Sequence, residues 1–126
     1  MATMSESLNV FDQPLVSCGE DPVTGYYRDG CCNTSEQDGG SHTVCVEISR
    51  EFLEASRARG NDLVTPRPEF GFPGLKPGDR WCVCAGRWLE AQQEGVAPRV
   101  YLTRTHKRAL ELVPLDVLRE YAADLH

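Results

Sequence analysis

The sequence predicts a single α+β domain with two layers, in which three to four helices cover a short sheet. Its 126 residues suffice for one domain. Hydrophobic residues make up 40% of the chain and charged residues 25%, as in globular proteins with a buried core. Strand-like and helix-like segments do not alternate strictly, which favours α+β over a parallel sheet. We expect a disordered tail at residues 1–8 and the domain at 9–126.

The clearest strand and the clearest helix follow each other in the first half of the chain. Residues 21–41 are rich in Asp, Gly, Asn, Ser and Thr, which predicts a loop. Valines alternate with Cys and Glu over residues 42–48, which predicts a strand. Ser49 is a suitable N-cap for a helix that ends at Gly60-Asn61.

A proline-rich loop and an ambiguous segment come next. Prolines and glycines are interleaved with apolar residues over 65–79, which predicts a rigid, packed loop of a length that is often functional. Residues 80–94 fit either a strand at their start or a helix throughout. We predict the helix, with Asp79 as its N-cap and Gly95 as its end, and the strand remains the alternative.

The C-terminal part predicts three short elements. Residues 99–103 should form a strand with Val100 and Leu102 on one face. Thr105 can cap a helical turn that continues through Leu110. Pro114 should open a last helix, because proline is favoured where a helix begins.

Charge and hydropathy exclude two classes of partner. The net charge of −6 argues against a nucleic-acid module, which is usually basic. The chain has no apolar run long enough for a membrane helix, and its start lacks the pattern of a secretory signal. We therefore expect a cytoplasmic protein that binds a small molecule or a protein, with no cofactor. Its cysteines should be thiols there, because the cytosol is reducing.

Two of the six cysteines stand out as candidates for chemistry. Cys31 and Cys32 lie in a polar loop, and either is a candidate nucleophile of a thiol-dependent enzyme. His42 would then be the base, and Arg28 would stabilise the thiolate. The remaining cysteines, with Cys18 apart in an early turn, are expected to be packing residues.

A structural metal site is a further alternative. Its ligands would be Cys31 or Cys32 together with His42, Cys45 and one of Cys82 and Cys84. The spacing matches neither a zinc ribbon nor a zinc finger, and no C-x-x-C pair is present. We therefore predict no metal ligand.

The favoured hypothesis is a binding site between two loops. One loop runs from Asp29 to Asn33, and the other is the proline-rich loop that ends at Arg80 and Trp81. Arginine can hold a carboxylate or phosphate through two hydrogen bonds, and aromatic rings can form the floor of a pocket. The competing interpretation is that the aromatic rings belong to the core and the arginines to ion pairs. The candidate ligand-binding residues are Arg28, Asp29, Asn33, Asn61, Asp62, Arg67, Glu69, Arg80 and Trp81.

Several long runs of this sequence are similar to one protein family. They are YYRDGCCNT at 26–34, GSHTVC at 40–45, RGNDL at 59–63 and TPRPEFGFPGLKPGDRWCVC at 65–84. With these runs the chain resembles the small bacterial proteins grouped as domain-of-unknown-function family 2237, over roughly residues 9–123. The resemblance implies a small two-layer α+β fold and no particular activity, so function has to be argued from the site.

Overall fold

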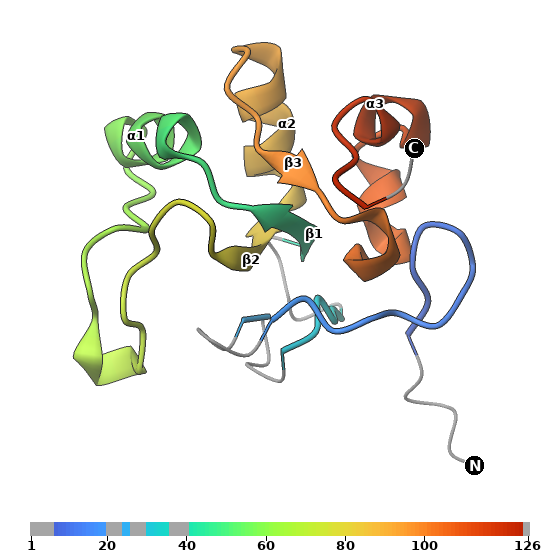
Figure 1. Ribbon diagram of the computed structural model, residues 1–126, viewed down its shortest axis with the longest axis horizontal. Coiled ribbons are helices and arrows are strands. Elements are labelled where there is room, and N and C mark those ends of the chain that lie inside the picture. The colour runs from blue at the N-terminus through green and yellow to red at the C-terminus, as the bar shows by residue number, and fades with distance from the viewer. Residues whose placement is uncertain (1–6, 20–23, 26–29, 36–40, 125–126) are drawn as a thin grey trace.

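A three-stranded antiparallel sheet in the order β2-β1-β3 is the centre of the computed structural model (Figure 1). The structure describes residues 7–19, 24–25, 30–35 and 41–124. The strands are β1 (His42–Glu47), β2 (Arg80–Cys84) and β3 (Arg99–Val100). Most of the predicted tail lies outside the described residues. Leu8, at its end, pairs with Pro14.

The two faces of the sheet carry different side chains. Val46 lies opposite Trp81, and the next pair along the strands is Cys45 opposite Cys82. Neighbouring residues of a strand point to opposite faces, so one face is aliphatic and aromatic and the other carries cysteines. Helices cover the first face, and the N-terminal segment crosses the second (Figure 1). This two-layer α+β arrangement confirms the predicted fold class.

The helices supply most of the remaining core. Phe52 and Leu53 of α1 and Trp88 of α2 are buried with the valines of the sheet. The indole NH of Trp88 donates to the carbonyl of Pro98 at 3.1 Å, so this large side chain is buried without an unpaired polar group. The helices are α1 (Arg50–Ala58), α2 (Ala85–Gln93) and α3 (Leu115–Arg119), with short 3-10 helices at Pro68–Phe70, Leu102–Arg104 and Lys107–Glu111.

Helix α1 begins and ends as the sequence predicts. The Ser49 side chain accepts a hydrogen bond from the amide of Phe52 at 3.2 Å, which satisfies one of the free amides of the first turn. Gly60 then adopts a positive φ of 88°, and the amide of Asn61 donates to the carbonyl of Ser56 at 2.8 Å. A left-handed residue after the last turn is the usual way for a helix to end.

The prediction of one helix over residues 80–94 is wrong for its first five residues. These residues form β2, and α2 starts only at Ala85, with Cys84 at its N-cap position. Pairing with β1 decides the conformation, because it buries Trp81 and Val83 and satisfies backbone groups along the strand. Asp79 caps no helix; its carboxylate accepts from the amide of Lys76 at 3.0 Å. The helix end at Gly95 is confirmed by its φ of 79°.

The C-terminal elements are shorter than predicted. Strand β3 ends at Val100, because the chain turns into a 3-10 helix instead of continuing to Thr103. The helical turn after Thr105 is capped by His106, whose Nδ1 accepts from the amide of Arg108 at 3.0 Å. Helix α3 follows Pro114 as predicted. Among the described residues, no helix is both long and apolar enough to cross a membrane.

Candidate functional site

Asp62, a predicted ligand residue, holds the entrance of the proline-rich loop in place. Its carboxylate accepts hydrogen bonds from the amides of Val64 and Thr65 and, at 2.6 Å, from the Thr65 hydroxyl. The hydroxyl contributes most to lowering the pKa of Asp62 from 3.8 to about 2, and the two amides add to it. Asp62 is therefore a turn-forming residue.

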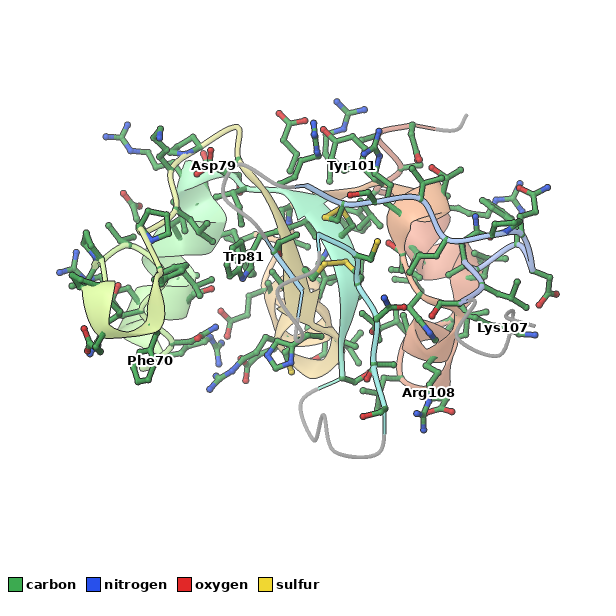
Figure 2. The ribbon with its side chains drawn as sticks, turned by 90° about the horizontal axis from the view of Figure 1, so that it is seen from below. Phe70, Asp79, Trp81, Tyr101, Lys107 and Arg108 are labelled. Atoms are coloured by element: carbon green, nitrogen blue, oxygen red, sulfur yellow. A yellow bond between two sulfur atoms is a disulfide. The ribbon has the colours of Figure 1, made fainter. Side chains whose placement is uncertain are left out.

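Arg67 and Glu69 lie at the outer end of the same loop. Both are exposed, and the backbone of Arg67 pairs with Phe72 to close the turn. Phe70 is 72% exposed and projects from this end of the loop, away from Trp81 (Figure 2). The predicted convergence of these charged side chains on Trp81 is therefore not observed.

Asn33 of the other predicted loop and Arg80 at the end of the proline-rich loop make contacts within the chain. The Ser7 hydroxyl donates to the side-chain carbonyl of Asn33. Arg80 donates from Nε to the carbonyl of Cys18 at 2.5 Å and so attaches the N-terminal segment to β2. Arg28 and Asp29 lie outside the described residues.

Three predicted residues do meet, in a cavity of about 210 Å³ beside the edge strand β2. They are His42, Asn61 and Trp81, and they come from β1, the end of α1 and β2. The pocket thus lies along β2 and not between the two predicted loops. Among the described residues, its lining consists of His42, Asn61, Leu63, Trp81, Cys82, Val83, Cys84 and Arg87.

The cavity brings a thiol, an imidazole and a guanidinium together. Cys84 pairs with His42 in the strand register, where a bulge interrupts β1 between His42 and Val44. Cys84 is half-buried and belongs to neither disulfide. Arg87, in the first turn of α2, has a 3.5 Å contact with Glu90. Cys84 was predicted only as an alternative metal ligand and Arg87 was not predicted as a site residue, because the pairing of β1 with β2 is what brings them beside His42.

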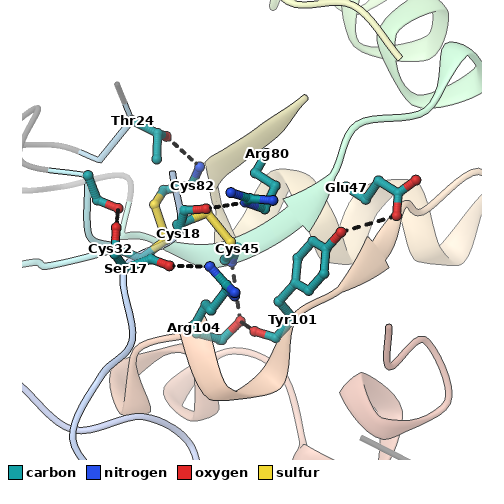
Figure 3. The surroundings of a disulfide bond; sticks show 12 residues. Ser17, Cys18, Thr24, Cys32, Cys45, Glu47, Arg80, Cys82, Tyr101 and Arg104 are labelled. Atoms are coloured by element: carbon teal, nitrogen blue, oxygen red, sulfur yellow. Dashed lines mark hydrogen bonds between the residues drawn. A yellow bond between two sulfur atoms is a disulfide. The ribbon is translucent and has the colours of Figure 1, made fainter. Parts of the chain in front are cut away.

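A second cluster lies on the other face of the sheet. Disulfides join Cys18 to Cys45 and Cys32 to Cys82 (Figure 3). All four side chains are buried, with at most 2% exposed. The prediction of Cys32 as a nucleophile is wrong for this form, because its sulfur is bonded and inaccessible. Cys18, expected to stand apart, belongs to the same cluster.

Hydrogen bonds fix the strand cysteines from both sides. The amide of Cys82 donates to Thr24 Oγ1 at 2.7 Å, and the amide of Cys45 donates to Thr105 Oγ1 at 3.2 Å. Both threonines are completely buried. These two hydrogen bonds therefore help to hold the backbone at Cys45 and Cys82 in place.

The cluster also has the composition of a metal site. The Sγ atoms of Cys18, Cys32 and Cys82 lie within 4.8 Å of one another. The alternative metal site considered from the sequence, which was not the prediction, included His42 and left out Cys18. His42 instead lines the cavity beside β2.

The comparisons with known proteins agree with the runs singled out in the sequence. Residues 8–122 match a family model described as an uncharacterized protein conserved in bacteria, DUF2237. The chain belongs to this family. The predicted resemblance is confirmed, and the matched residues of this DUF2237 protein include both the cavity and the cysteine cluster. No curated protein matches the chain.

Proposed function

We propose that this DUF2237 protein is a cytoplasmic small-ligand binding domain whose site is the cavity beside β2. The observation that carries the proposal is the lining, which combines Arg87, His42 and Asn61 with the indole of Trp81. Ligand pockets typically combine an apolar wall with a few convergent polar groups of this kind. The proposal keeps the predicted binding function and moves its site.

The lining favours a small ligand that carries a carboxylate. A guanidinium offers two parallel donors to a carboxylate, and the Asn61 amide and the His42 imidazole add further donors. The volume of about 210 Å³ is below the range of drug-sized pockets, which begins near ~300 Å³. A ligand of the size of a short organic acid therefore fits.

Titration with short mono- and dicarboxylic acids, followed by amide NMR shifts, tests this proposal. We expect saturable shifts at His42, Asn61 and Arg87. Arg87→Gln should weaken binding about 10- to 100-fold, because it removes a hydrogen bond between charged groups worth roughly 1.5–3 kcal/mol. Arg67→Gln is the matched control and should bind like the parent. Equal effects of both variants, or no saturable shifts, would contradict the proposal.

A second candidate function is thiol chemistry at Cys84. Its pairing with His42 is the specific observation, since a base beside a thiol is the basis of nucleophilic catalysis. Cys84 also occupies the N-cap position of α2. For Cys31, the original candidate, the role of nucleophile stays a prediction.

Alkylation by iodoacetamide at neutral pH, with the labelled sites identified by mass spectrometry, separates these cysteines. We expect Cys84 to react faster than Cys31, and His42→Gln to slow only the reaction of Cys84. If Cys31 reacts faster and depends on His42, the original assignment holds instead. If His42→Gln changes neither rate, neither cysteine is activated by this imidazole.

A further inference from the structure

We propose that the four buried cysteines Cys18, Cys32, Cys45 and Cys82 become a thiolate metal site when their disulfides are reduced. The site would take one Zn²⁺ ion in place of the two disulfides. It lies on the opposite face of the sheet from the helices, and it shares Cys82 with the lining of the cavity beside β2.

The positions of the four sulfurs support a tetrahedral site. Three Sγ atoms already lie within 4.8 Å of one another, and Cys45 Sγ is bonded to one of them, Cys18 Sγ. Four thiolates at about 2.3 Å from zinc are about 3.8 Å apart. Opening the disulfides therefore requires the bonded sulfurs to move apart, which rotation of cysteine side chains can provide. Two ligands lie opposite each other on β1 and β2, so half of the site is fixed by strand pairing.

The charges around the cluster fit thiolates better than disulfides. A zinc ion with four thiolates has a net charge of −2, and a buried charge requires compensation. Two guanidiniums border the cluster (Figure 3). Arg80 donates to the carbonyl of Cys18, and Arg104 donates from Nη1 to the carbonyl of Ser17 at 2.6 Å. Both guanidiniums are thus hydrogen-bonded to the segment that carries Cys18, beside the position where the negative charge would develop.

The conversion balances in electrons and protons. Each disulfide takes up two electrons and two protons and yields two thiols, so the cluster requires four electrons from a phosphine or dithiol reductant. Zinc then displaces four protons and forms four Zn–S bonds. In reverse, two molecules of a low-molecular-weight disulfide accept the four electrons, the protein disulfides re-form and the ion is released. The N-terminal segment is linked to the sheet in both states. In a reducing cytoplasm the thiolate form is the relevant one.

Cobalt titration of the reduced full-length chain tests this inference. The protein is reduced anaerobically with a phosphine, the phosphine is removed, and Co²⁺ is added, followed by Zn²⁺. We expect one equivalent of Co²⁺, with tetrahedral ligand-field bands, a charge-transfer band of four thiolates, and displacement by Zn²⁺. The oxidised protein should bind none. Less than about a tenth of an equivalent in the reduced chain, or a spectrum with fewer than four thiolates, would overturn the proposal.

Serine variants identify the ligands. Cys18→Ser and Cys45→Ser should each lower the affinity for Co²⁺ at least tenfold. Cys31→Ser and Cys84→Ser are the matched controls and should keep the parental stoichiometry and spectrum. Binding that is lost in these controls and kept in Cys18→Ser would overturn the assignment. If a ligand variant fails to fold, the number of thiolates in the Co²⁺ spectrum of the unaltered chain tests the four-thiolate site by itself.

Discussion

Single polar residues of this protein divide into those that serve the fold and those that line a cavity. Asp62 and Arg80 were predicted to bind a ligand, but their hydrogen bonds go to the chain itself. His42, Asn61 and Trp81 were predicted as site residues, and they do line one cavity. Residue type shows which side chains can bind a ligand. Whether they do so depends on their partners, which are close in sequence for Asp62 and distant for Arg80.

The carboxyl group of Asp62 should titrate near pH 2 in the folded protein. Its pKa is lowered from 3.8 because the charged form accepts hydrogen bonds from Thr65 and Val64. The stabilisation is therefore complete above about pH 4 and is lost as the pH falls towards 2. NMR titration of the side-chain carboxyl measures this midpoint. Thr65→Val removes the hydroxyl donor and should raise the midpoint, whereas Thr103→Val is a distant control. An unshifted midpoint in Thr65→Val would refute this cause.

At the scale of single helices and strands, local sequence signals and strand pairing can favour different conformations. Helix α1 follows from local signals, since Ser49 caps its start and Gly60 follows its end. The segment Arg80–Glu94 has good helical spacing throughout, yet its first five residues form β2. Pairing with β1 overrides the helix that the local sequence favours over these five residues.

Removal of the α1 cap should destabilise the protein measurably. Ser49→Ala eliminates the hydrogen bond from the Phe52 amide and should lower the free energy of unfolding by about 1 kcal/mol. Urea denaturation followed by circular dichroism measures the change. Ser49→Asp is the matched control, because its carboxylate can accept the same hydrogen bond. An equal loss in both variants would show that the cap is not the source of the effect.

At the scale of the whole molecule, two interlocked disulfides connect the N-terminal segment to the sheet. Cys18 is bonded to β1 and Cys32 to β2, so each strand of the central pair holds one part of that segment. Where the structure describes this segment, it has isolated bridges at Leu8 and Asn9 and lies outside the three-stranded sheet. The cross-links therefore substitute for strand pairing in the second layer.

Loss of the Cys32–Cys82 disulfide should lower the free energy of unfolding of the oxidised, metal-free protein by about 4 kcal/mol. The reason is the entropy of the unfolded chain, in which this disulfide closes a loop of about 50 residues. The double variant Cys32→Ala/Cys82→Ala, compared with the parent in urea without reductant, measures this cost. With a reductant and a chelator present the difference should shrink strongly, since neither protein then has that cross-link. A difference that persists unchanged would assign the effect to packing of the sulfurs.

The sequence by itself determined the α+β class, the family, strand β1, both ends of α1 and the start of α3. These features rest on alternation, capping residues and long sequence runs, all of which are local. The tertiary structure decided that Arg80–Cys84 is a strand, that Cys84 pairs with His42 in the strand register, and that four cysteines from four segments meet in one buried cluster. Contacts between residues as far apart as Cys32 and Cys82 depend on how the segments pack, and a single sequence does not record that geometry.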